Sequence, residues 1–250
     1  MDKYSCGLVS ISFRENSPEE IMEAVKRAGL TCVEWGSDVH APCNDLDKLN
    51  KIVELQNKYG ISCSSYGTYF RLGSDSIDDL QNYIDAAKVL GTDILRLWCG
   101  DRLSASYTED EKEALYSDCI KAAEIAETNN VILCMECHRN SYTETVDGML
   151  DLMKAVDSPN FRMYWQPNQF RTDEENFRYA ELVLPYCKVV HVFNWKGEDR
   201  FPMSEGVSIW KEYVKILDGV DTYLLEFMPD DNIESLGKEA SALFDVLNKN

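Results

Sequence analysis

The stretch Asn129-Asn130-Val131-Ile132-Leu133-Cys134-Met135-Glu136-Cys137-His138 shows the unit from which the fold is assembled. An amphipathic segment of helical length, 109–128, ends at the two asparagines. Asparagine tolerates the left-handed conformation that commonly closes a helix. The apolar run 132–138 that follows has the length of a buried strand. The stretch therefore predicts a helix followed by a strand, with a glutamate and a histidine near the carboxyl end of that strand.

Apolar runs of strand length recur along the whole chain, at 5–13, 32–37, 61–67, 94–99, 132–138, 161–166, 188–194 and 222–227. Further amphipathic segments lie between the early runs, at 18–28, 45–58 and 76–89. The spacing is roughly 30 residues, which is the length of a βα unit. Eight such units in 250 residues predict a (β/α)8 TIM barrel. We expect residues 1–250 to form a single domain.

Local signals mark both ends of the expected helices. Glycines that can take the left-handed cap stand at Gly29, Gly60 and Gly91, and Asn129-Asn130 takes that place before the run 132–138. Capping patterns mark three helix starts, at 17–20, 108–111 and 172–175.

An open doubly wound sheet is the alternative fold. It usually has a glycine-rich turn after its first strand, and residues 10–16 contain no glycine.

Composition limits the classes of partner. The chain has 44 acidic and 25 basic residues, a formal net charge of −19, which disfavours nucleic acid and anionic membranes as partners. It has no apolar run near the ~18 residues of a membrane helix, and its first residues do not resemble a signal peptide. Nine scattered cysteines are typical of reduced thiols. We expect a cytoplasmic protein.

Ionisable residues gather at the carboxyl ends of the expected strands, which share one mouth in a barrel. The histidines are His40, His138 and His191, and Glu136 and Glu226 stand within apolar runs. A buried carboxylate needs a cation or several hydrogen bonds. A metal site, where imidazoles and carboxylates serve as ligands, or a catalytic site is therefore the favoured interpretation of this glutamate pair.

Other polar residues are expected at the same mouth, including Glu34, Arg96, Arg102, Gln166, Gln169 and Lys196. Trp195, between Asn194 and Lys196, is the candidate for stacking on a sugar.

Cys134 and Cys137 form a C-x-x-C pattern. Residues three apart on a strand point to opposite faces, so we do not expect these thiols to bind one metal.

At residues 136–145 the sequence resembles the E-x-H-x-x-x-[LY]-T-[DE]-T pattern of the xylose-isomerase-like TIM-barrel superfamily, which includes sugar phosphate isomerases and epimerases. Ser158-Pro159-Asn160 and Gln166-Pro167-Asn168 resemble the next unit of that family. The endonuclease members need more histidines than three and a basic surface, so that branch is disfavoured.

The resemblance implies a metal-ligand set of Glu136, Gln166, His191 and Glu226. The family often has aspartate at the position of Gln166 and histidine at that of Gln169. An amide oxygen binds Mg²⁺ or Mn²⁺ but brings no charge. Mn²⁺ or Mg²⁺ is therefore the expected metal, Zn²⁺ or Co²⁺ remains open, and an empty site is an alternative.

The function that this implies is isomerisation or epimerisation of a sugar or keto-polyol through an enediolate. Glu136 and Glu226 would be the acid/base pair. Substrate contacts are expected from His138, Arg102, Lys196, Trp195 and His40. The alternatives are a lyase resembling inosose dehydratase and a non-catalytic sugar-binding barrel whose metal site is degenerate at Gln166. A homo-oligomer is also compatible with the resemblance.

Overall fold

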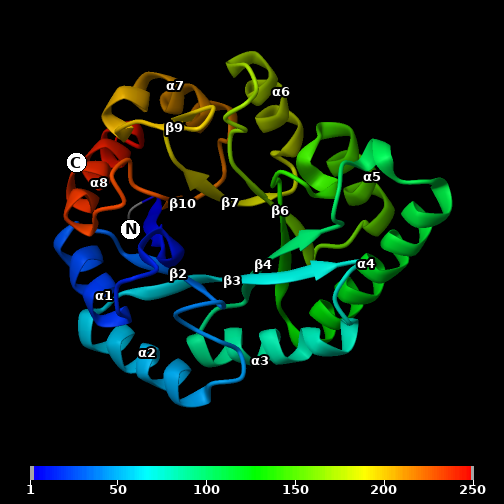
Figure 1. Cartoon of the computed structure of the whole chain (residues 1–250), viewed down its shortest axis with the longest axis horizontal. Coiled ribbons are helices and arrows are strands. Elements are labelled where there is room, and N and C mark those ends of the chain that lie inside the picture. Colours follow the sequence, from blue (N-terminus) through cyan, green and yellow to red (C-terminus); the bar gives the residue numbers. More distant parts are fainter. Residues whose placement is uncertain (1–2, 249–250) are drawn as a thin grey trace.

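A computed structural model of the chain describes residues 3–248. Eight parallel strands close into a barrel in the order β1-β10-β7-β6-β5-β4-β3-β2 (Figure 1). They are β1 (Ser5–Val9), β2 (Cys32–Gly36), β3 (Ser62–Leu72), β4 (Ile94–Cys99), β5 (Ile132–Glu136), β6 (Phe161–Trp165), β7 (Cys187–Val192) and β10 (Thr222–Leu225). The closed parallel barrel confirms the predicted TIM barrel and excludes the open sheet.

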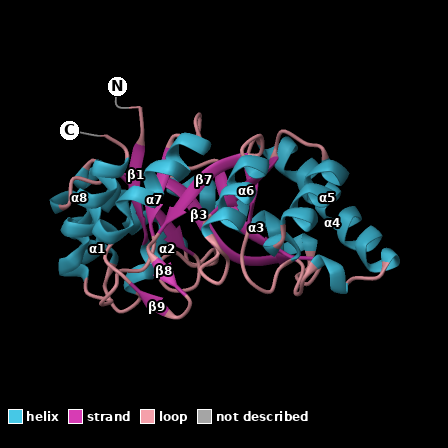
Figure 2. Cartoon of the chain, turned by 90° about the horizontal axis from the view of Figure 1, so that it is seen from above, coloured by secondary structure: helices cyan, strands magenta, loops and turns pink. Residues whose placement is uncertain are grey.

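Helices surround the barrel, one after each strand (Figure 1). They are α1 (Pro18–Arg27), α2 (Leu46–Tyr59), α3 (Leu80–Leu90), α4 (Glu109–Asn129), α5 (Val146–Val156), α6 (Asp173–Val183), α7 (Met203–Ile216) and α8 (Leu236–Val246). A short hairpin, β8 (Trp195–Lys196) with β9 (Asp199–Arg200), lies on the face opposite to the chain ends (Figure 2). No helix within residues 3–248 is long and apolar enough to cross a membrane.

The predicted helix ends are confirmed. Gly29, Gly60, Gly91 and Asn130 all have positive φ angles, between 55° and 82°, at the points where the chain leaves a helix for a strand. The capping boxes at the starts of α1, α4 and α6 are formed. In each, the glutamate at the third helical position accepts a hydrogen bond from the backbone N–H of the N-cap residue. Local capping interactions therefore determine where each helix begins and ends.

Two layers of apolar side chains hold the barrel together. The larger lies between the strands and the helices. The smaller fills the barrel interior and consists of Val9, Ile11, Cys32, Cys134, Tyr164, Val189 and Leu224. Cys134 belongs to the inner layer and Cys137 to the outer one, so the predicted separation of these thiols is confirmed.

Every barrel strand except β4 differs in its bounds from the predicted range. The first strand ends at Val9, because residues 10–13 form a 3-10 helix whose serines bond across the barrel mouth. Ser12 Oγ, for example, accepts a hydrogen bond of 2.8 Å from the backbone N–H of Phe227. Strand β3 continues to Leu72 after a register shift against β4, and β5 ends at Glu136, before His138.

Candidate metal centre

A layer of polar side chains lies directly above the inner apolar layer. On a strand, residues two apart share one face. Four members of the inner layer are followed two residues later by an ionisable residue, giving the pairs Cys32 with Glu34, Cys134 with Glu136, Val189 with His191 and Leu224 with Glu226. The period of two therefore directs these ionisable groups into the barrel, toward the carboxyl ends of the strands.

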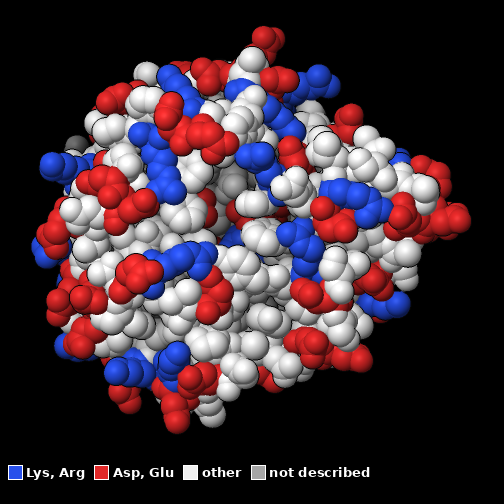
Figure 3. Space-filling model, viewed as in Figure 1, with Lys and Arg blue, Asp and Glu red and all other residues white. Residues whose placement is uncertain are grey.

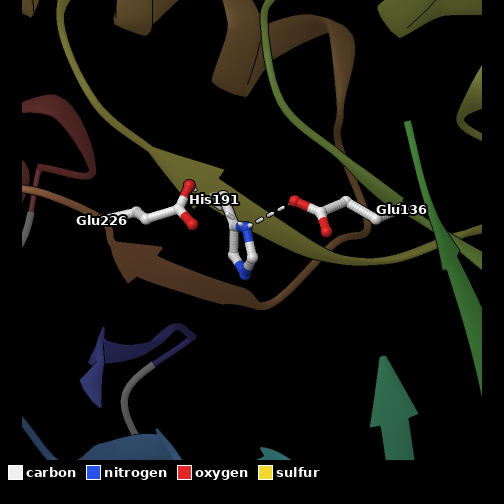
Figure 4. A group of neighbouring side chains, drawn as sticks. All are labelled: Glu136, His191 and Glu226. Carbon is white, nitrogen blue, oxygen red and sulfur yellow. Dashed lines mark ion pairs between the residues drawn. The ribbon is translucent and has the colours of Figure 1, made fainter. Parts of the chain in front are cut away.

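Glu136, His191 and Glu226 converge at this level. Each offers a ligand atom, and these atoms all lie within 4.8 Å of one another. Figure 4 shows the two carboxylates reaching the His191 ring from opposite sides. Nδ1 of His191 lies 3.7 Å from an oxygen of Glu136 and 3.4 Å from one of Glu226. The geometry is that of a group able to hold a cation.

Gln166, the fourth residue of the expected ligand set, is also brought to this group. Its Oε1 atom lies 3.0 Å from Nδ1 of His191. An amide oxygen is thus available beside two carboxylates and an imidazole.

Two further buried ionisable residues, Glu34 and Arg96, belong to the same layer. Arg96 Nε donates a hydrogen bond of 2.9 Å to Glu34, and its Nη1 donates to Glu136. Trp98 Nε1 donates a 2.5 Å bond to the same Glu136 oxygen. Glu136 therefore has one oxygen held by two donors, and the other faces His191.

The charges of this buried group suit it to hold a cation. Three carboxylates, those of Glu34, Glu136 and Glu226, face one guanidinium, so two negative charges remain when His191 is neutral. Burial alone would lower the pKa of His191, but the charges of Glu226 and Glu34 outweigh burial and raise it. The residues fit a divalent cation, which would balance the two charges.

The ionised state of the carboxylates follows from their neighbours. Burial alone would raise the pKa of Glu34, but the charges of His191 and Arg96 lower it to about 2. The pKa of Glu136 is likewise held well below its usual range, because Arg96 outweighs the cost of burial. Both groups are therefore anionic at neutral pH.

A cavity of about 100 Å³ opens above the group. Glu136, Gln166 and Glu226 form part of its wall, and His138 and Trp195 also line it. The His138 ring stacks on Trp98, with centroids 4.8 Å apart. The indole N–H of Trp195 is buried and has no hydrogen-bond partner among residues 3–248. The predicted substrate contacts His138 and Trp195 thus face the same small cavity as the glutamates.

Lys196 lies beside this cavity. It lines a neighbouring cavity of about 900 Å³ between α6 and α7, whose wall shares Pro167, Phe193 and Trp195 with the smaller one. Its side chain is exposed and is absent from the lining of the smaller cavity.

The other two predicted substrate contacts are not brought to the group. Arg102 forms ion pairs with Asp101 and Glu111 at the start of α4 and lines a separate cavity there. His40 is buried, with its ring nitrogens 3.1 Å from Ser10 Oγ and from the carbonyl oxygen of Asn16. The loops after β4 and β2 turn these side chains away from the centre of the mouth.

The sequence placed Glu34 and Arg96 at the mouth without giving them a role. The signal for a role was present, since each stands in a strand whose neighbours are apolar, as Glu136 and Glu226 do. Applied to all strands, the rule that a buried charge needs a partner would have found both residues.

The face that carries the mouth is hollowed at its centre. Figure 3 shows acidic side chains spread over the outer part of this face and basic ones along the edge of the hollow. On this face, the acidic side chains therefore lie mainly at the periphery.

Comparison with known proteins agrees with this geometry. The model of the family described as Xylose isomerase-like TIM barrel matches residues 22–246. The chain belongs to this family. No curated protein matches the sequence of this family member.

Several solved structures share the fold of the family. The probable 3-DHS dehydratase AsbF from Bacillus anthracis is 15% identical, with a TM-score of 0.80 over 99% of this chain and 100% of that one. A Xylose isomerase-like TIM barrel protein from Mycobacterium smegmatis, in complex with magnesium, is 13% identical, with a TM-score of 0.72 over 98% and 96%. D-Psicose 3-epimerase from Clostridium cellulolyticum H10 is 16% identical, with a TM-score of 0.69 over 98% of each chain. At these identities the likeness establishes the fold alone.

Proposed function

We propose that this protein is a divalent-metal-dependent isomerase or epimerase of a sugar or keto-polyol. The observation that carries the proposal is the convergence of Glu136, His191 and Glu226 below a small cavity, in a group that keeps two uncompensated negative charges when His191 is neutral. Mn²⁺ or Mg²⁺ is the proposed metal, held by these residues and Gln166; Zn²⁺ or Co²⁺ is the alternative. A bound cation would stabilise the negative charge that develops on a substrate oxygen when the adjacent carbon loses a proton.

The two glutamates are the proposed acid/base pair. They reach the centre from opposite sides of His191, so one substrate carbon between them can lose a proton on one face and gain it on the other. Their surroundings differ, because Glu136 accepts bonds from Arg96 and Trp98, whereas the ion pair found for Glu226 within residues 3–248 is with His191. Different surroundings suit the two carboxylates to different protonation states during a cycle.

His138 and Trp195 are the proposed substrate contacts within the cavity. The Trp195 ring can pack on the apolar face of a sugar, while its unpartnered N–H offers a hydrogen bond to a hydroxyl. Lys196 would reach the substrate from the neighbouring cavity. Contacts from Arg102 and His40, whose side chains face elsewhere, stay predictions.

Solvent exchange tests the reaction. The Mn²⁺-loaded protein is incubated in deuterated water with a panel of ketoses and inososes, and deuterium at the carbon next to the carbonyl is measured by NMR. We expect metal-dependent incorporation that falls at least ~100-fold in Glu136→Gln, since general acid–base catalysis contributes that much or more. Unchanged exchange in this variant would remove Glu136 from the role of base.

A lyase reaction is the second candidate, because it begins with the same proton removal and then expels a β-hydroxyl. The fold shared with a probable dehydratase favours retaining it. Mass spectrometry of the product distinguishes the two reactions, since a lyase product has lost the mass of water.

A non-catalytic sugar-binding barrel is the third candidate, motivated by the uncharged ligand Gln166. Elemental analysis of the purified protein tests it. Stoichiometric metal together with metal-dependent turnover would eliminate this candidate. Cytoplasmic location and a homo-oligomeric state remain predictions.

A further inference from the structure

Glu34 is a buried carboxylate for which the proposed reaction has no use. Its side chain is fully buried in β2, and the described residues that line the mouth cavity do not include it. Because it is fully buried and does not line that cavity, we assign it no contact with substrate. Burying a carboxylate at such a position destabilises the folded state unless hydrogen bonds or opposite charges replace its lost hydration.

Those contacts fix the carboxylate in one orientation. Ser65 Oγ donates a hydrogen bond of 2.9 Å to one oxygen, and Arg96 Nε donates one of 2.9 Å to the other. Gly67 provides the space, because a Cβ atom there would lie 2.5 Å from Glu34 and 3.1 Å from Arg96. The carboxylate is therefore held rigidly by neighbouring strands.

The oxygen bonded to Ser65 faces His191. It lies 3.4 Å from Nε2 of the ring, while Nδ1, on the other side of the ring, faces Glu136, Glu226 and Gln166. The edge of the ring also contacts Tyr164, at a centroid distance of 5.0 Å. One ring nitrogen is thus directed at a fixed carboxylate and the other at the ligand group.

We propose that Glu34 is a positioning residue that would hold the His191 proton on Nε2 when the Nδ1 lone pair binds the metal. The inference rests on the proposed metal-dependent function. A histidine ligand needs one unprotonated nitrogen, and a carboxylate that accepts from the other nitrogen fixes both the tautomer and the ring orientation. Glu34 lies on the Nε2 side, away from the ligand atoms, so it acts through the imidazole.

Glu34→Gln tests this role because it keeps the size of the side chain. The amide can donate to Nε2 of His191, which favours the wrong tautomer. We expect Mn²⁺ affinity, measured by isothermal titration calorimetry, to fall 10- to 100-fold, the range found when such partners of metal-bound histidines are removed. Ser65→Ala, which removes one bond that orients Glu34, should give a smaller fall of the same kind.

A matched control is Glu239→Gln, since Glu239 is also buried but accepts its hydrogen bond from Met203 at the start of α7. We expect unchanged Mn²⁺ affinity in this variant. Circular dichroism establishes that each variant is folded before affinity is compared. If Glu34→Gln does not fold, the role of Glu34 is tested by the Mn²⁺ affinity of Ser65→Ala and by the ¹⁵N chemical shifts of His191 described next.

The ¹⁵N chemical shifts of His191 in the unsubstituted protein loaded with diamagnetic Zn²⁺ report the tautomer directly. We expect metal on Nδ1 and a proton on Nε2. A proton on Nδ1, or equal Mn²⁺ affinity in Glu34→Gln and the unsubstituted protein, would overturn the role of Glu34 while leaving the metal site intact. Absence of metal binding by the unsubstituted protein would instead overturn the proposed function, and this inference with it.

Discussion

Replacing Gly67 with alanine tests whether the Glu34–Arg96 pair depends on an empty space in β3. Gly67 has no left-handed backbone, so alanine can adopt its conformation. The added methyl group would lie 2.5 Å from a Glu34 oxygen and 3.1 Å from Arg96 Nη2, both closer than van der Waals contact allows. The neighbours must therefore move, and both are fully enclosed.

The cost follows from overpacking a rigid interior. One extra methyl group in a well-packed core costs about 1–3 kcal/mol. For a chain of this size, 1 kcal/mol lowers the melting temperature by roughly 2–4 °C, so we expect a decrease of about 2–12 °C. We also expect weaker Mn²⁺ binding, because Arg96 holds Glu136 as well as Glu34.

Gly237→Ala is the control. A Cβ atom at Gly237, near the start of α8, meets nothing within 4 Å. This substitution should leave metal binding unchanged and stabilise the protein by about 0.4–1 kcal/mol, since it restricts the unfolded chain. Differential scanning calorimetry and titration of Mn²⁺ measure both effects. Equal melting temperatures and metal affinities for the two variants would show that a methyl group at position 67 does not disturb Glu34 and Arg96.

Four further predictions concern the metal group and local chemistry. Saturating Mn²⁺ at 100 times its dissociation constant should stabilise the protein by about 2.7 kcal/mol, and chelation should reverse the shift; a melting temperature insensitive to metal would contradict the site. Gln166→Asp adds a third uncompensated negative charge and should tighten Mn²⁺ binding; weaker binding in calorimetry would show that the amide is required. Burial raises the pKa of Cys137 to about 12, so iodoacetamide at pH 8 should modify Cys137 after denaturation and not before, as peptide mass spectrometry can check. Backbone N–H groups of Ser17, Thr108 and Thr172 lower the pKa values of Glu20, Glu111 and Glu175, so these carboxylates stabilise the fold above their unfolded pKa and lose that effect as pH falls through the lowered folded values. A triple Gln variant should therefore lose less stability between pH 6 and pH 3 in urea titrations; an equal loss would be evidence against the capping boxes.

Local features of the sequence specify the barrel. Its repeat length, its left-handed caps at Gly60, Gly91 and Asn130, and its capping boxes each act within a few residues of their own position. The period of two within strands also determines which side chains point inward. This period, together with the family resemblance, is why the amino-acid sequence predicts the ligand set Glu136, Gln166, His191 and Glu226, which the barrel brings to one mouth.

The partners of these residues depend on the tertiary structure. Glu34 contacts His191 across 157 positions of sequence, and one guanidinium binds two carboxylates from different strands. Barrel closure and strand register create these contacts, and no local pattern encodes them. The paths of the loops could not be predicted from the sequence either. The direction of Arg102 depends on its ion pair with Glu111 in the next helix, and that of His40 on a contact with Asn16 in an earlier loop. Local interactions fix the elements, whereas the chemistry of the site arises from contacts between elements that only folding brings together.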